Sequence, residues 1–239
     1  MTFDDLDLRL YAIVDPEHDG GRQLPELARM IAAGGATLIQ LRDKKSDVRA
    51  MTELAKAVKA ALPSHVPLII NDNIEVMLAS GADGVHLGQD DMSVLEARKR
   101  LGPMPFVGLT VQTIGHAQAA PLADIDYVGI GGVYATGSKN NPRAPIGVHG
   151  LSDIVEVFRY RIGNFPMCAI AGITKDNAAE TIAAGADGVS VISALSKAPD
   201  PTLAARELRA VIDAALERRA PMVPDTRDQR RAKAQAQPR

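Results

Sequence analysis

Short apolar runs alternate with longer segments of helical periodicity along almost the whole chain. The runs are nearly continuous in apolar residues, which is typical of parallel strands buried on both faces. The eight predicted strands are Arg9 to Val14, Thr37 to Leu41, Pro67 to Ile70, Gly84 to Leu87, Phe106 to Leu109, Tyr127 to Ile130, Met167 to Ile170 and Gly188 to Ile192. The eight predicted helices that follow them are Leu24 to Ala33, Asp47 to Leu62, Ile74 to Ser80, Ser93 to Leu101, Ile114 to Leu122, Leu151 to Arg161, Lys175 to Ala184 and Leu203 to Glu217.

Eight strand–helix units with no linker between the two halves of the chain predict an α/β fold, a single (β/α)8 TIM barrel. A doubly wound sheet is the alternative. A weak internal repeat favours the barrel, because a helix end, Gly, Ala and then a strand recur in AAGGATLIQL, ASGADGVHL and AAGADGVSV. Gly35, Gly81 and Gly185 are expected to end these helices with positive φ. We therefore expect residues 1–220 to form one catalytic barrel domain.

Residues 221–239 read differently from the rest of the chain, with two early prolines, a polar and basic composition and no hydrophobic periodicity. The formal net charge of −2 divides into −7 for residues 1–217 and +5 for residues 218–239. These features predict a basic, disordered C-terminal tail that neither activity nor stability requires.

The composition excludes several classes of function. An acidic body is a poor nucleic-acid binder, and 3% aromatic residues with no Trp leave little surface for stacking bases. Cys168 is the only cysteine, which excludes disulfides within the chain and Cys-rich zinc sites, and its place inside a strand predicts a buried, inert thiol. The N-terminus lacks a signal-like apolar region, and prolines and polar residues interrupt the longest uncharged stretch. We expect a cytoplasmic protein with small-molecule substrates, no nucleic-acid or membrane partner, and a homo-oligomer as an open alternative.

The active site of a barrel lies at the carboxyl ends of its strands, so polar residues after each apolar run are the informative ones. Asp72 and Asp91 follow neighbouring strands, and two carboxylates can hold Mg²⁺ when substrate phosphate completes its coordination shell. The alternative for Asp72 is an N-cap, because Asn71, Asp72 and Asn73 open a helix. The pairing with a second carboxylate favours the metal.

Cations and phosphate-binding groups follow other strands. Arg42, Lys44 and Lys139 can bind phosphate oxygens. The alternative is that these side chains are solvated charges on loops, and we prefer that interpretation for Lys45. The loop from Thr136 to Lys139 offers hydroxyls and backbone N–H groups without P-loop spacing. Gly172, together with Ile192 and Ser193, marks the position where such barrels usually bind a phosphate. The alternative for Gly172 is an ordinary left-handed turn. These residues predict one cationic site suited to a diphosphate and one neutral site suited to a monophosphate, with no convincing nucleophile.

Taken together, these motifs resemble the thiamine phosphate synthase family. The matching segments occur in family order across residues 9 to 196, and jointly they are highly specific: QLRDK from Gln40, INDNIEV from Ile70, ADGVHLGQDDM from Ala82, TGSK from Thr136, AIAGIT from Ala169 and ADGVSVISAL from Ala186. The resemblance implies a transferase of thiamine biosynthesis that uses Mg²⁺. It would join an aminopyrimidine carried as its methyl diphosphate to a thiazole phosphate.

The resemblance also assigns roles to individual residues. It implies that Asp72 and Asp91 hold Mg²⁺, and that the residues acting on the leaving diphosphate are Arg42, Lys44, Lys139 and Thr110. The positions implied for the pyrimidine diphosphate are Gln40, Leu41, Arg42, Asp43, Lys44, Asn71, Thr110 and Lys139. Those implied for the thiazole phosphate are Thr136, Gly137, Ser138, Gly172, Ile192 and Ser193.

The sequence departs from the family pattern at three places. Thr110 replaces the usual Ser, TGSK replaces the common TPTK, and Ala171 replaces a usual Gly. These changes keep the charges and hydroxyls that the chemistry needs, so they affect loop order and affinity more than reaction type. Two rivals are a thiazole tautomerase and a noncatalytic phosphate-binding barrel, neither of which needs the paired carboxylates.

Overall fold

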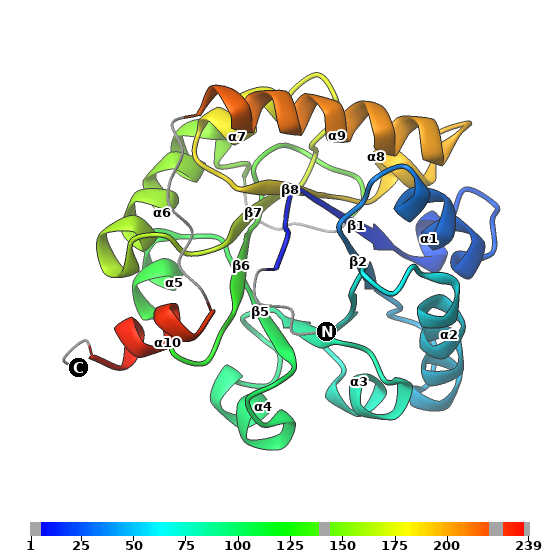
Figure 1. Ribbon diagram of the computed structural model, residues 1–239, viewed down its shortest axis with the longest axis horizontal. Helices are drawn as coiled ribbons and strands as arrows, with labels where there is room; N and C mark the ends of the chain where they lie inside the picture. The colour runs from blue at the N-terminus through cyan, green and yellow to red at the C-terminus, as the bar shows by residue number, and fades with distance from the viewer. Residues whose placement is uncertain (1–5, 139–143, 220–226, 237–239) are drawn as a thin grey trace.

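Eight parallel strands close into a barrel in the computed structural model, which describes residues 6–138, 144–219 and 227–236. Each strand pairs with its neighbours in sequence, and β1 pairs with β8 to close the ring (Figure 1). This confirms the TIM barrel and excludes the doubly wound sheet. The strands are β1 (Leu10–Val14), β2 (Leu38–Leu41), β3 (Leu68–Asn71), β4 (Gly84–Leu87), β5 (Phe106–Val111), β6 (Tyr127–Ile130), β7 (Met167–Ile170) and β8 (Gly188–Val191).

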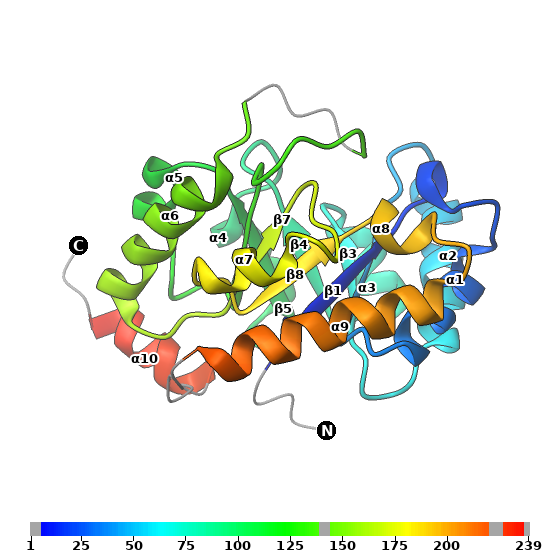
Figure 2. The same cartoon turned by 90° about the horizontal axis from the view of Figure 1, so that it is seen from above.

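Helices surround the barrel and cover the outer face of the sheet (Figures 1 and 2). Those that the sequence predicts are α1 (Leu24–Ala33), α2 (Val48–Ala61), α3 (Ile74–Ser80), α4 (Val94–Leu101), α5 (Ile114–Ala119), α6 (Gly147–Ile162), α7 (Ala178–Ala183) and α9 (Pro201–Arg218). Periodicity does not predict the short elements η1 (Pro16–His18) and α8 (Ser193–Ser196), which are too brief to show it. None of the helices in the described ranges is both long and apolar enough to cross a membrane.

Local sequence signals set where the helices begin and end. Asp47 caps α2 by accepting a hydrogen bond from the Ala50 backbone N–H at 2.8 Å, and Asp200 caps α9 through Leu203 at 3.0 Å. The three glycines of the repeat have positive φ, of 107° at Gly35, 73° at Gly81 and 115° at Gly185, as predicted. At Gly81 this left-handed backbone ends α3 and turns the chain toward β4.

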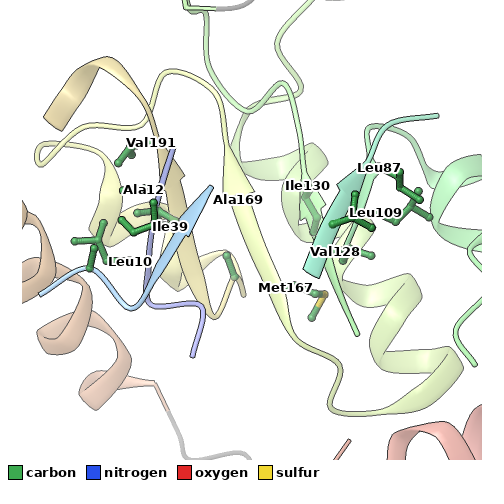
Figure 3. Close-up of a cluster of buried hydrophobic side chains, with 14 of the residues drawn as sticks. Leu10, Ala12, Ile39, Leu87, Leu109, Val128, Ile130, Met167, Ala169 and Val191 are labelled. Atoms are coloured by element: carbon green, nitrogen blue, oxygen red, sulfur yellow. The ribbon is translucent and has the colours of Figure 1, made fainter. Parts of the chain in front are cut away.

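Two layers of buried side chains lie on either side of the sheet. The outward-facing residues of the strands pack against the helices in one large cluster, in which Leu10, Ala12, Ile39 and Val128 are fully buried (Figure 3). The second cluster comes from the inward-facing strand positions and from the chain leading into β1: Leu8, Tyr11, Leu38, Ile69, Phe106, Tyr127 and Cys168. Many inward positions nearer the carboxyl ends of the strands carry polar residues or glycine, and these line the cavity described below.

The C-terminal segment corrects the sequence prediction. Part of the segment expected to be disordered, Arg227–Ala236, forms the helix α10, which lies beside α6 outside the ring of strands (Figure 1). Its Arg231 guanidinium donates to the Pro103 carbonyl at 3.0 Å and to the buried Asp126 carboxylate at 3.4 Å. The helix docks through charge and hydrogen bonds, which leave no hydrophobic periodicity in the sequence. Residues 221–226 and 237–239 of the same segment lie outside the described residues.

Candidate active site

One cavity of about 330 Å³ opens at the carboxyl ends of the strands, where a barrel carries its active site. Inward-facing residues of the strands form its floor, among them Tyr11, His86, Cys168 and Ser190. The structure brings these predicted residues together around it: Gln40, Arg42, Asn71, Thr110, Thr136, Ser138, Gly172, Ile192 and Ser193. They come from opposite sides of the ring, from β2 to β5 on one side and from the β6–α6 loop, β7 and β8 on the other.

Three predicted residues are placed differently, and a fourth is not described. The Leu41 side chain is fully buried in the core between sheet and helices. The Asp43 carboxylate turns toward its own loop, where it accepts hydrogen bonds from the backbone N–H groups of Lys45 at 2.9 Å and Ser46 at 3.0 Å. Gly137 lies exposed in the β6–α6 loop, and Lys139 lies outside the described residues.

Arg42 is held in the cavity wall by Asp15, a residue that the sequence analysis missed. The two side chains form an ion pair, and Asp15 is 1% exposed. The Asp15 carboxylate also accepts the Glu17 backbone N–H at 2.8 Å, which caps η1. A charge-assisted bond to a fixed carboxylate restricts a guanidinium to one orientation. The signal was available, because Asp15 directly follows the first apolar run as the other candidates follow theirs.

A cluster of charges lies at the rim next to Asn71. Lys44 forms an ion pair with Asp72, and the Asn71 side-chain amide donates to the same Asp72 oxygen at 2.6 Å. Asp91 lies close enough that its carboxylate raises the pKa of Asp72. Asp91 in turn accepts the Gly88 backbone N–H at 2.6 Å. The structure therefore places the two predicted metal carboxylates side by side, with an ammonium group beside them.

The N-cap alternative for Asp72 is excluded, because α3 is capped by Asn73, whose side chain accepts the Val76 N–H at 3.0 Å. Asp72 instead has a left-handed backbone, with φ of 61°, and turns its carboxylate to the rim. Burial, and next the Asp91 carboxylate, raise the pKa of Asp72, while the Lys44 ammonium lowers it. Burial and like charge both penalise the ionised form, and a cation bound between the carboxylates would relieve that penalty.

The opposite side of the cavity combines hydroxyls with a tightly packed backbone. The Ser138 hydroxyl lies 3.0 Å from that of Ser193, the first residue of α8. Gly172 has φ of 66°, and a Cβ there would come within 2.7 Å of the Tyr134 Cβ, so only glycine fits both the turn and the packing. Lys197 also lines the cavity on this side. Lys197 is a cation on this side that the strand-end pattern did not single out, and the prediction of a neutral monophosphate site stays a prediction.

Cys168 is confirmed as buried, at 1% exposure, and burial raises the pKa of its thiol to about 12. A thiol with such a pKa is protonated at neutral pH and is a poor nucleophile.

The part of the chain that the structure describes holds no group of three or more His, Cys, Asp or Glu side chains arranged for a metal ion. Two carboxylates suit Mg²⁺, which keeps part of its shell for water and substrate phosphates.

The closed barrel and the cavity at the carboxyl ends of its strands define the class of TIM-barrel proteins. The chain belongs to the thiamine monophosphate synthase family, whose model matches residues 10–195. It is a transferase of thiamine biosynthesis.

The relatives cover nearly the whole barrel. A thiamine-phosphate synthase from Agrobacterium fabrum is 46% identical over 217 residues, which are 90% of this chain and 99% of that protein. One from Moorella thermoacetica is 43% identical over 85% of this chain and 95% of that protein. Among solved structures, a thiamine phosphate pyrophosphorylase from Pyrococcus furiosus superposes with a TM-score of 0.77 at 34% identity, covering 88% of this chain and 98% of that one.

Proposed function

We propose that the protein is a Mg²⁺-dependent thiamine-phosphate synthase. It would transfer the 4-amino-2-methylpyrimidine methyl group from its diphosphate to 4-methyl-5-(2-phosphoethyl)thiazole, giving thiamine monophosphate and diphosphate. The observation that carries the proposal is the apposition of Asp72 and Asp91 beside Lys44, next to the cavity and across from the Ser138–Ser193 pair. That arrangement offers one place for a metal and a diphosphate and a second for a monophosphate.

The cations of the rim act on the leaving group. Arg42, oriented by Asp15, and Lys44 bind the diphosphate oxygens and stabilise the negative charge that develops as the bond to the pyrimidine methylene breaks. Lys139 would add a third cation. A bound Mg²⁺ held by Asp72 and Asp91 would supply further positive charge to the same oxygens. A general base is not needed, because the thiazole nitrogen captures the pyrimidine methylene cation with its own lone pair.

The hydroxyls on the far side hold the second substrate. Thr136, Ser138 and Ser193 can donate to the thiazole phosphate, and Lys197 adds positive charge there. Holding the nitrogen and the methylene within reach of each other makes the coupling effectively unimolecular.

Incubating the purified protein with both substrates, with and without EDTA, tests the function. We expect thiamine phosphate only when Mg²⁺ is available. Isomerisation of a thiazole carboxylate phosphate without coupling would identify a tautomerase. Binding of the thiazole phosphate with no product would identify a noncatalytic barrel. Either result would overturn the proposal, and so would full synthase activity in EDTA.

Asp72→Asn tests the metal site with the smallest change in shape. Asn tolerates the left-handed backbone of residue 72, so the fold should be kept while one negative charge is lost. We expect turnover to fall at least about a hundredfold, the range seen when one electrostatic contact to a transition state is lost. Asp90→Asn is the matched control, because it removes an exposed carboxylate next to Asp91. Turnover near wild type in Asp72→Asn would contradict the assignment.

A further inference from the structure

A chain of hydrogen bonds crosses the floor of the cavity from Gln40 to Thr110. The Gln40 amide donates to the Tyr11 hydroxyl, which lies 3.0 Å from the Tyr127 hydroxyl. The Tyr127 hydroxyl lies 3.1 Å from His86 Nδ1, and His86 Nε2 lies 2.9 Å from Thr110 Oγ1. The five side chains come from β2, β1, β6, β4 and β5, so the chain of hydrogen bonds links five of the eight strands.

The barrel makes room for this chain at a specific place. A Cβ at Gly108 would collide with the Tyr127 ring and would lie 2.5 Å from His86 Nδ1. A Cβ at Gly129 would lie 3.2 Å from His86 Cε1. Both glycines occupy inward-facing strand positions, where such barrels ordinarily carry bulky aliphatic residues. Their missing side chains allow a Tyr–His contact to replace aliphatic packing.

The direction of the chain follows from what each group can donate. The Gln40 nitrogen is only a donor, so the Tyr11 hydroxyl accepts a hydrogen bond from it. The Tyr11 O–H is then left to donate its own hydrogen bond to the Tyr127 hydroxyl. Burial raises the pKa of both phenols well above the ordinary value, so each hydroxyl keeps a proton to donate. Tyr127 then donates to His86 Nδ1, which must be unprotonated to accept. A neutral imidazole in this state carries its proton on Nε2 and donates it to Thr110 Oγ1.

We propose that Tyr127 is a positioning residue that fixes His86 in its Nε2–H tautomer, so that the Thr110 hydroxyl turns its proton into the cavity toward an acceptor atom of the substrate. The Thr110 oxygen accepts the His86 N–H, and its own O–H is left to donate to the substrate. Tyr127 acts through His86, because it is not among the residues that line the cavity, whereas His86 and Thr110 are. The substrate in this inference rests on the proposed function, but the tautomer is a property of the protein alone.

The tautomer is measured directly by ¹⁵N NMR of the histidine side chains in the full chain without substrate. The sequence has 5 histidines, so comparison with a His86→Gln sample assigns the signal. We expect the unprotonated nitrogen of His86 to be Nδ1 and the protonated one to be Nε2. A proton on Nδ1, or a doubly protonated ring, would overturn the inference even if the enzyme makes thiamine phosphate. Failure to make thiamine phosphate would overturn the proposed function while leaving the tautomer result standing.

Two phenylalanine variants separate positioning from packing. Tyr127→Phe removes the donor to Nδ1, and we expect a mixture of His86 tautomers and about a tenfold fall in kcat, with KM changed less than about twofold. Tyr11→Phe keeps the Tyr127 hydroxyl, which can still donate, so the Nε2–H tautomer should persist. The control Tyr160→Phe removes an exposed hydroxyl on α6 and should change neither quantity. An unchanged tautomer and kcat in Tyr127→Phe would refute the role.

A pair of His86 variants guards against a general loss of structure. The His86→Gln side chain can place an amide N–H near the position of Nε2 and should partly restore the donation to Thr110. His86→Asn is too short to reach it. We expect His86→Gln to keep at least about tenfold more kcat than His86→Asn. Equal activity in the two variants would show that the donation to Thr110 is not what His86 provides.

Discussion

Asp72 and Ala171 have left-handed backbones at the ends of β3 and β7, with φ of 61° and 92°. A residue with a Cβ pays roughly 1–2 kcal/mol for this conformation. Such strain persists where the surrounding structure enforces it, and it is common at functional sites. At Ala171 the carbonyl oxygen accepts the Tyr134 N–H at 3.0 Å, which ties the end of β7 to the β6–α6 loop.

Ala171→Gly should stabilise the protein. Glycine adopts this backbone without the Cβ penalty, and the gain exceeds the greater entropy that glycine has in the unfolded chain. We expect the free energy of unfolding to rise by about 1 kcal/mol in a urea titration. Ala169→Gly, in the interior of the same strand, should instead lower it by about 1 kcal/mol or more, because that alanine is fully buried in the core. A loss of stability in Ala171→Gly would show that Ala171 is not strained.

Polar residues at or just beyond the carboxyl ends of the strands were predictable, and those nearer the middle of a strand were not. Arg42, Asn71 and Thr110 were found because the ends of parallel strands meet at one face of a barrel. Tyr11 and Tyr127 lie in apolar runs that give no sign of which side chains point inward, so their hydrogen bonds could not be read from the sequence. The pairing of Lys44 with Asp72 likewise depends on how two loops approach each other.

Among the elements, α10 is the helix in a segment for which the sequence predicted disorder. Its contacts run from Arg231 to Asp126, a carboxylate that is 2% exposed as a residue and also accepts Arg98 at 3.0 Å and the Val107 N–H at 2.8 Å. A guanidinium bound to a buried carboxylate needs no apolar stripe on its helix. Hydrophobic periodicity therefore predicted the barrel helices, which pack through aliphatic faces, and missed a helix that docks through its charges.

Truncation after Ala220 should lower the melting temperature, contrary to what the sequence suggests. Loss of the charged hydrogen bond to Asp126 should cost about 1 kcal/mol, which corresponds to about 2–4 °C for a domain of this size. Arg231→Ala should account for much of that shift in differential scanning calorimetry. Arg218→Ala is the control, because it removes an exposed arginine of α9. An unchanged melting temperature in the truncated chain would show that α10 adds no stability.

At the scale of the whole molecule, the position of each charge says more than the net charge. The acidic body and the basic C-terminal segment meet where Arg231 reaches Asp126, away from the cavity. Arg42 and Lys197 line the cavity, and Lys44 pairs with Asp72 at its rim. Many other charge distributions would give the same net charge of −2, so composition alone could not locate the site.

Closure of the ring also brings the first and last elements of the barrel together. Because β1 pairs with β8 and Arg9 contacts Asp213 of α9 at 3.3 Å, the two ends of the barrel's sequence lie close together. A short Gly/Ser linker from residue 218 to residue 6 could join them. New ends could then open between the exposed Ser64 and His65, in a loop on the face opposite the site.

This circular permutant should fold and keep synthase activity within about threefold of the chain truncated after Ala220, measured in the same assay. A permutant opened between Gly137 and Ser138 should fold equally well and lose activity, since its ends would free the loop that carries Ser138 toward Ser193. Failure of the first to fold would mean that the barrel depends on where its synthesis begins. Success would mean that the fold and the activity depend on the order of the elements around the ring and not on where the chain begins.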